Sequence, residues 1–262
     1  MLDKILNEVE RLKGLKGEDN WTSSVRNIEN YEEEFISAET WGGIGRRKIF
    51  IPKNKEKYVD LQSSRSFTIN NEEDFNSFIK HASDLSLKES DDVRIYELDN
   101  YGFKDMDGFC EIGFRSCKLM NYYQEASHYV FGYDAVNLNI LIAQHLEFPV
   151  KRHDLMHDNI GLELSNYPLV VCYHVLEHLS DPFSAIKKIY NSMSPSSCFH
   201  VEIPIEENGP HLNFGHLFPF YRNDLQLMLL SAGFKIHNIS NKTHSGGPLI
   251  ERIIAIKKNN KI

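Results

Sequence analysis

Short apolar runs alternate with longer stretches of helical periodicity from about Phe109 to the end of the chain. Buried strands of a parallel sheet have such run-like hydrophobic patterns, and crossover helices fill the gaps between the strands. We therefore predict an α/β fold with seven strands, which lie at Phe109–Ile112, Tyr129–Asp134, Val150–Asp154, Leu169–Tyr173, Cys198–Pro204, Phe234–Ser240 and Arg252–Lys257.

Turn and capping residues separate these segments at three places. Asp181-Pro182 is typical of an N-cap followed by a proline in the first helical turn. Ser194-Pro195-Ser196 predicts a turn, and Gly233 predicts the end of a helix. Helices are therefore expected to begin and end between the predicted strands.

Residues 1 to about 95 lack this regular alternation. The N-terminus, MLDKILNEVERLK, has helical spacing of apolar residues among charges, so it predicts an amphipathic helix and not a secretory signal. Another helix is predicted over Asn71–Leu85, where an apolar stripe follows an acidic first turn. We assign no fold between Asn20 and Asp60. The chain is accordingly divided into an N-terminal extension, residues 1–95, and a second domain, residues 96–262.

The composition narrows the functional classes. The chain has 262 residues, of which 41% are hydrophobic and 25% charged, as in soluble globular proteins. Its formal net charge of −8 disfavours broad binding to nucleic acids and to anionic membranes. No apolar run is long enough to span a membrane, so we expect a cytoplasmic protein. The cysteines predict buried thiols without disulfides or a cysteine zinc site, because they form no CxxC pair.

Candidate ligand contacts follow the predicted strands, because ligands of open parallel sheets bind at the carboxyl ends of the strands. Asp134 ends the second strand 21 positions after Gly113, which follows the first strand. This is about the spacing at which an acidic side chain binds an adenosine ribose, so we predict a nucleoside cofactor. Capping of the next helix is the alternative for Asp134. A dinucleotide is disfavoured because Arg115 and Lys118 stand where its pyrophosphate requires glycines.

The most specific motif follows the fourth predicted strand and reads His174-Val-Leu-Glu177-His178-Leu-Ser-Asp181-Pro182. With it the chain resembles, over about residues 108–257, the class I S-adenosylmethionine (SAM)-dependent methyltransferases of the VLEH type, including bacterial polysaccharide and sugar methyltransferases. The resemblance implies a Rossmann-like seven-stranded sheet with helices on both faces. Further matching pieces are Glu111-Ile-Gly113, Phe131-Gly-Tyr-Asp134, His200-Val-Glu-Ile-Pro204 and the segment from His216 to Phe234.

The resemblance also implies how SAM would bind, with S-adenosylhomocysteine as product. Gly113 would let the backbone pass close to the methionine part, and Glu111 would anchor this loop or the ammonium group. Asp134 would hold the ribose and Asp154 the adenine amino group, with helix capping as the alternative for each. Arg115 would pair with the methionine carboxylate, or face solvent beside a glutamate. The other predicted contacts are Ala135, Leu155, which would pack on adenine, and Tyr173.

The chain departs from the family at two positions. Arg115 and Cys117 stand where the family usually has glycines. This departure motivates the alternative of a methyltransferase-like module that binds a partner or sugar without turnover.

Methyl transfer to an alcohol requires removal of the acceptor proton, for which histidine is the usual base near neutral pH. His174 directly follows the fourth strand and is the first candidate. Glu177 and His178 are further candidates, with bracing of the following loop as the alternative. The loop from Glu202 to Tyr221 contains aromatic and polar residues and suits a hydroxylated acceptor. It also contains the candidate bases His211 and His216.

A divalent metal is a further option for this loop, with His211 or His216 joining Glu202. Three or four such ligands would be needed, and the spacing does not establish them, so no metal residues are assigned. Near the N-terminus, the segment from Trp41 to Phe50 would form a lid, or more plainly a β-hairpin with solvated arginines. If the acceptor carries a diphosphate, we expect it to meet basic residues of the extension, such as Arg26, Arg46 and Arg47.

The sequence therefore predicts a SAM-dependent O-methyltransferase. The expected acceptor is a hydroxyl of a small metabolite, and the specific hypothesis is a nucleotide-activated or capsular sugar such as a heptose. Methylation of nitrogen or carboxylate, the non-catalytic module and a nicotinamide oxidoreductase stay as alternatives. No nucleic acid or membrane partner is expected, and the oligomeric state is left open.

Overall fold

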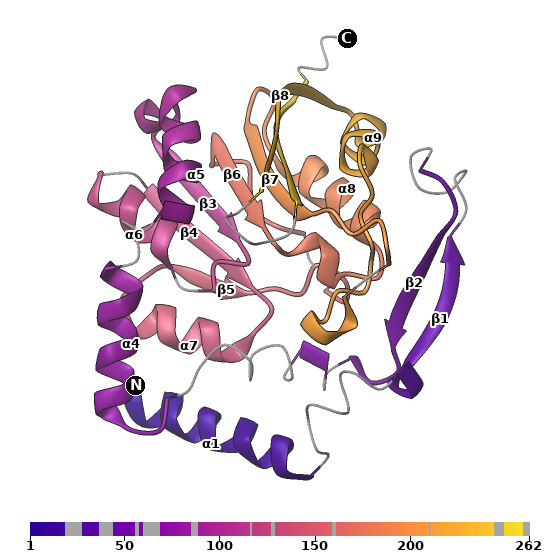
Figure 1. The fold of residues 1–262 in the computed structure, drawn as a ribbon. Coiled ribbons are helices and arrows are strands. Elements are labelled where there is room, and N and C mark those ends of the chain that lie inside the picture. Colours follow the sequence, from indigo (N-terminus) through magenta and orange to yellow (C-terminus); the bar gives the residue numbers. More distant parts are fainter. Residues whose placement is uncertain are drawn as a thin grey trace. The chain divides into compact units, whose positions relative to one another are not determined.

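The computed structural model describes residues 1–18, 28–36, 44–55, 58–59, 69–84, 89–115, 117–126, 129–158, 161–209, 211–243 and 249–258. These residues form two compact units. Figure 1 labels their helices and strands. The first unit consists of Met1–Asn30 and Pro52–His153, and the second of Tyr31–Ile51 and Asp154–Ile262. The predicted division at residue 95 stays a prediction.

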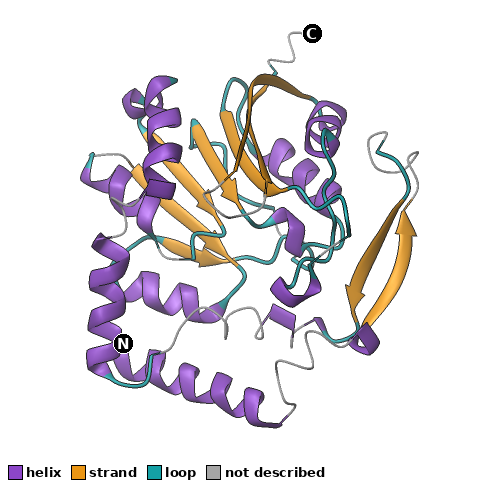
Figure 2. Cartoon of the chain, viewed as in Figure 1, coloured by secondary structure: helices purple, strands orange, loops and turns teal. Residues whose placement is uncertain are grey.

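The main sheet has seven strands in the order β5-β4-β3-β6-β7-β9-β8, and helices flank it (Figure 2). The pairs β3·β4, β4·β5 and β6·β7 are parallel. This confirms the Rossmann-like seven-stranded sheet. The strands are β3 (Gly108–Ile112), β4 (Tyr129–Asp134), β5 (Val150–Arg152), β6 (Leu169–Tyr173), β7 (Cys198–Pro204), β8 (Phe234–Thr243) and β9 (Leu249–Lys257).

The parallel pattern of the earlier strands does not extend to β9. β9 pairs antiparallel with both β7 and β8. Only residues 244–248 separate β8 from β9, which is far too few for the crossover helix that a parallel connection needs. β5 also ends at Arg152 and not at Asp154, because residues 154–158 fold into a hydrogen-bonded turn.

The first unit contains the N-terminal helix and the helices next to the first three strands of the sheet. The predicted amphipathic helix is present as α1, and its buried residues Ile5, Val9 and Leu12 pack against Leu138 and Ile142 of α7. The helix predicted over Asn71–Leu85 is present as α4, although Leu85 lies outside the described residues. The elements are α1 (Leu2–Glu18), η1 (Ile28–Asn30), α4 (Glu72–Asp84), α5 (Glu89–Asn100), η3 (Phe103–Asp105), α6 (Lys118–Glu125) and α7 (Asn137–His145).

The second unit contains the last four strands and a separate two-stranded sheet. The predicted helix ends are confirmed: Asp181 caps α8 by accepting a 2.8 Å hydrogen bond from Ser184 N–H, and α9 ends at Gly233 with φ +109°. The predicted turn closes with a 3.2 Å bond from Ser197 N–H to the Ser194 carbonyl. The elements are β1 (Tyr31–Ile36), β2 (Arg47–Pro52), η4 (Leu176–His178), α8 (Pro182–Ser192), η5 (Leu212–Phe214) and α9 (Asp224–Ala232).

The four cysteines are buried, as predicted, and carry free thiols; they are Cys110, Cys117, Cys172 and Cys198. Within the described ranges, no helix is both long enough and apolar enough to cross a membrane.

Candidate functional site

The loop after β3 has an unusual backbone. Gly113 has φ +78°, and its N–H donates a 2.7 Å hydrogen bond to the carbonyl of Tyr133 on β4. Arg115 and Cys117 also have positive φ, +41° and +58°, although both carry side chains. The left-handed region costs about 1–2 kcal/mol for a non-glycine residue. The loop thus keeps, at the two positions where the resemblance expects glycine, the backbone conformation that glycine favours.

Asp134 ends β4 and uses its carboxylate to hold this loop. Oδ1 accepts a 2.8 Å bond from Val136 N–H, while Oδ2 accepts bonds from Asn139 Nδ2 (3.0 Å) and Arg115 N–H (3.3 Å). Burial raises the pKa of Asp134, against the lowering effect of these donors. The helix-capping alternative does not describe its position, because the N-cap of α7 is Val136. Two carboxylate oxygens offer about four lone pairs, so acceptor capacity is left for further donors.

The other predicted cofactor residues of the first unit surround this loop. Glu111 is buried on β3, directly before Ile112 and Gly113. Burial raises the pKa of the Cys117 thiol, and the nearby Glu111 carboxylate raises it further. Arg115 is exposed, and Ala135 follows Asp134 in the turn before α7. The structure therefore brings Glu111, Gly113, Arg115, Asp134 and Ala135 together at the ends of β3 and β4.

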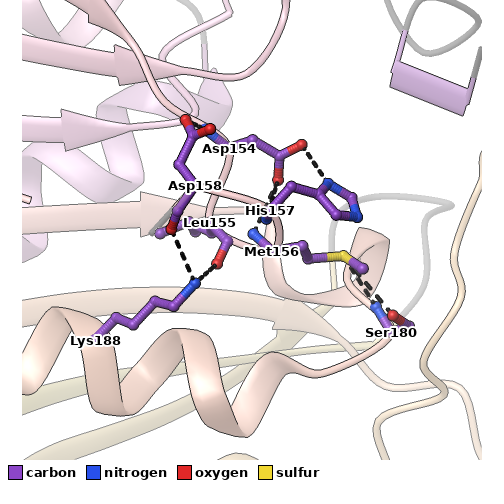
Figure 3. Close-up of polar contacts among 7 residues, drawn as sticks. All are labelled: Asp154, Leu155, Met156, His157, Asp158, Ser180 and Lys188. Atoms are coloured by element: carbon purple, nitrogen blue, oxygen red, sulfur yellow. Dashed lines mark hydrogen bonds and ion pairs between the residues drawn. The ribbon is translucent and has the colours of Figure 1, made fainter. Parts of the chain in front are cut away.

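Residues 154–158 form a closed turn that is tied to α8 (Figure 3). Asp154 accepts hydrogen bonds from Met156 N–H (2.9 Å) and His157 Nδ1 (2.7 Å). Burial alone would raise the pKa of Asp154, but these bonds outweigh it and hold the pKa below its usual value. Lys188 Nζ on α8 donates to the carbonyl of Leu155 at 2.7 Å. Asp154 thus braces a turn rather than a helix, and Leu155 is buried beneath it.

Several charged side chains contact one another in the second unit, beginning with His174 directly after β6. His174 has a positive φ of +52°, and its imidazole lies between two carboxylates. Its Nδ1 is 3.2 Å from Glu177 Oε1, and its Nε2 is 2.8 Å from Glu202 Oε1. Arg252 Nε on β9 donates a 2.6 Å bond to the other oxygen of Glu202. Tyr173, the last residue of β6, instead pairs its hydroxyl with His200 Nδ1 at 2.6 Å.

The two carboxylates control the charge of His174. Burial lowers the pKa of this imidazole, but hydrogen bonds and attraction from Glu177 and Glu202 outweigh burial and raise it to about 9. His174 is therefore an imidazolium at neutral pH and donates through both ring nitrogens. To act as the predicted base, it must first lose a proton.

Further histidine contacts involve the loop after β7. His178 Nδ1 is 2.9 Å from the Gly215 carbonyl, and His216 Nδ1 is 2.5 Å from Glu206 Oε1. His211 Nδ1 lies 3.2 Å from the same Glu206 oxygen, and 55% of its side chain is exposed. All five predicted catalytic candidates therefore lie within the second unit. His174 pairs with Glu177, His211 and His216 both contact Glu206, and His178 lies near Glu177 and His216.

Two residues that contact these side chains were not predicted as site residues from the sequence. Glu206 joins His211 to His216, but its spacing to them follows no helix or strand period. Arg252 is 2% exposed and interrupts the apolar strand β9. A charged residue within such a run was the available signal, because charges are rarely buried unless they are paired.

The arginines after the glycine-rich segment differ from the expectation of solvated side chains. Arg47 donates to Asp224 Oδ1 at 2.9 Å, and its guanidinium lies 3.7 Å from the centroid of the Tyr221 ring. Its side chain is only 12% exposed, so this expectation is wrong for Arg47. Arg46 is exposed and stacks over Phe35. Trp41, Gly42, Gly43 and Arg26 lie outside the described residues.

No protein-family model matches the chain, and no curated protein sequence matches it significantly. Among solved structures, the chain is similar to magnesium protoporphyrin IX methyltransferase from Synechocystis PCC 6803 with bound S-adenosylhomocysteine. The two sequences are 14% identical, the TM-score is 0.52, and the alignment covers 69% of this chain and 88% of that chain. The chain is also similar to a structure of the Haloferax volcanii complex between the Trm112 methyltransferase activator and a candidate methyltransferase. The identity is 9%, the TM-score is 0.53, and the alignment covers 72% of this chain and 97% of that chain. At these identities the likeness concerns the fold alone. The chain has the class I SAM-dependent methyltransferase fold.

Proposed function

We propose that the protein transfers the methyl group of SAM to a hydroxyl of a small metabolite. The observation that carries this proposal is Asp134, a buried carboxylate at the carboxyl end of β4, beside the positive-φ Gly113 loop. A ribose hydroxyl is a donor, and the lone pair that the three existing hydrogen bonds leave on this carboxylate suits it. The side chains present therefore fit an adenosine cofactor.

The remaining cofactor contacts belong to the same proposal. Gly113 leaves room for the methionine part, and Glu111 anchors the loop or the ammonium group. Ala135 borders the ribose, and Arg115 pairs with the methionine carboxylate. Asp154, Leu155 and Tyr173 complete the proposed set, with Asp154 and Leu155 at the adenine.

When bound, SAM supplies an electrophilic methyl group, and the protein has to position the acceptor and accept its proton. His174 and His211 are the two proposed bases. His174 lies between Glu177 and Glu202 and carries a proton in this arrangement. His211 donates its Nδ1 proton toward Glu206, which leaves Nε2 as the acceptor nitrogen on a half-exposed ring.

The proposed acceptor is a sugar, either nucleotide-linked or capsular. Phe214 is 61% exposed, and its ring centroid is 6.1 Å from that of His211. An exposed aromatic ring beside polar groups suits a sugar, whose apolar face stacks while its hydroxyls form hydrogen bonds. Because Arg47 is committed to Asp224, a diphosphate contact would involve Arg46 and Arg26.

The test is calorimetry with SAM, followed by incubation with labelled SAM and a panel of nucleotide sugars. We expect heat of binding from the wild type and about 10–100-fold weaker binding by Asp134→Asn, because a charged acceptor of the ribose hydroxyls is lost. Glu10→Gln, which changes an exposed carboxylate on α1 outside the proposed contacts, is the matched control. Mass spectrometry then identifies the sugar that gains a methyl group. Unchanged SAM affinity in Asp134→Asn would remove this residue from the proposed site.

The second candidate function is a methyltransferase-like module that binds a sugar or partner without turnover. It is favoured by the side chains of Arg115 and Cys117 at positions that the resemblance assigns to glycine. A folded protein that gives no heat with SAM or S-adenosylhomocysteine would support it. Amine and carboxylate acceptors in the same panel distinguish N- and carboxyl-methylation from O-methylation.

A further inference from the structure

Two histidines and a glutamate of the second unit form a compact group, which we call the Glu-His-His cluster. It consists of Glu177 and His178 on η4 and His216 on the loop after β7. One potential ligand atom from each residue lies within 4.8 Å of those of the other two. The rings of His178 and His216 are edge-to-face, with centroids 4.9 Å apart.

Hydrogen bonds determine which nitrogen of each imidazole carries the proton. The Gly215 carbonyl can only accept, so Nδ1 of His178 is the protonated nitrogen. His216 likewise donates Nδ1–H to the Glu206 carboxylate. In a neutral imidazole this leaves the lone pair on Nε2, the nitrogen available to a metal ion. Metal-binding histidines almost always donate the other N–H to a carbonyl or carboxylate in this way.

The carboxylate of Glu177 lies beside the two imidazoles of the cluster. Its Oε1 is 3.2 Å from His174 Nδ1. The titratable groups facing Glu177 are His174, whose Nδ1 contacts Oε1, and the two histidines of the cluster.

The second oxygen of Glu177 is the observation that points to a missing ligand. The Glu177 side chain is 1% exposed, and its Oε2 is buried without a hydrogen-bond partner among the described residues. Buried carboxylate oxygens are ordinarily paired, because leaving one unpaired forfeits its hydration. A cation bound at Oε2 would supply the absent partner.

The backbone holds the two parts of the cluster in place. The Glu177 carbonyl accepts hydrogen bonds from Leu217 N–H at 2.7 Å and from Phe218 N–H at 3.1 Å. These bonds, with that from His178 to Gly215, join η4 to the segment that carries His216. The arrangement therefore does not depend on surface side chains meeting by chance.

We propose that the Glu-His-His cluster binds one divalent first-row transition ion, with Zn²⁺ as the preferred ion. Imidazole ligands favour Zn²⁺ over Mg²⁺ and Ca²⁺, which prefer oxygen. Zinc bound at 2.0–2.2 Å in tetrahedral geometry needs ligand atoms about 3.3–3.5 Å apart, so the cluster contracts around the ion. Three protein ligands leave one coordination position for water or a hydroxyl ligand. The proposal does not depend on the proposed methyl transfer, because its test measures metal binding.

The test uses the full chain after removal of metals with a chelator. Zinc affinity is measured by competition with a chromophoric chelator. The coordination geometry is measured by the visible absorption of Co²⁺ added in place of zinc. We expect one Zn²⁺ per chain that excess Mg²⁺ does not displace, and at least 100-fold weaker binding by Glu177→Gln and His216→Gln. His211→Gln is the matched control, because His211 touches Glu206 but is outside the cluster, and its affinity should stay within about threefold.

Glu206→Gln provides a second, independent readout. Glu206 positions His216 and is not itself a ligand, so its loss should weaken Zn²⁺ binding by about 10–100-fold without changing the stoichiometry. This variant keeps the proposal testable if a ligand variant fails to fold. The proposal is overturned if the wild type binds no Zn²⁺, if Glu177→Gln and His216→Gln bind as tightly as the wild type, or if His211→Gln loses as much affinity as they do.

Discussion

The positive φ of Arg115 leads to a prediction about stability. An L-residue in the left-handed region costs about 1–2 kcal/mol, whereas glycine adopts it without a steric penalty. Arg115→Gly removes that penalty but also makes the unfolded chain more flexible, which costs about 0.4–1 kcal/mol. The Arg115 side chain is exposed, so its truncation has little packing cost. We therefore expect Arg115→Gly to be more stable than Arg115→Ala by about 0.5–1 kcal/mol.

The assay is equilibrium unfolding in urea of the wild type, Arg115→Gly and Arg115→Ala, with the slope of each transition compared. Arg115→Ala is the control, because it removes the same guanidinium while keeping a Cβ at φ +41°. A glycine variant no more stable than the alanine variant, at equal slopes, would refute the argument about backbone strain. Calorimetry on the same proteins separates the proposed cofactor role: if Arg115 pairs with the methionine carboxylate, both variants should lose SAM affinity equally, by up to about fivefold.

Two other predictions concern the proposed base and a helix end. If His174 is the base, His174→Ala should lower turnover by about 100-fold or more with unchanged SAM affinity. If His174→Ala turns over at the wild-type rate and His211→Ala is slow, the role belongs to His211. Gly233→Ala should destabilise the protein by about 2 kcal/mol or more, because φ is +109° and a Cβ would lie 2.8 Å from the Tyr190 ring. Gly161→Ala, where a Cβ meets nothing within 4 Å, is its control in thermal unfolding, and equal losses in both would contradict this explanation.

Much of the fold was predictable because its determinants are local. A strand buried on both faces needs an apolar residue at nearly every position, so β3, β6 and β7 can be read from the sequence. Asp181-Pro182 and Gly233 determine helix ends through the conformation of one or two residues. The antiparallel direction of β9 was not predicted, because an apolar run has the same pattern in either direction.

The candidate site was predictable only in its parts. The motif around His174 to His178 and the histidines of the following loop were recognised as chemically suitable. Their pairings were not, because Glu206 and Arg252 reach them from distant parts of the sequence. The prediction of His174 as a base also did not include its contacts with Glu177 and Glu202, the two carboxylates that raise its pKa.

The amino-acid pattern by itself determined the order and type of the main-sheet elements and the ends of several helices. It did so because burial and chain geometry act over a few neighbouring residues. Tertiary structure alone decided which carboxylate meets which imidazole, and therefore where protons lie and where a buried oxygen lacks a partner. Electrostatic interactions depend on distance in space and on exclusion of water, and neither can be read from separation along the chain.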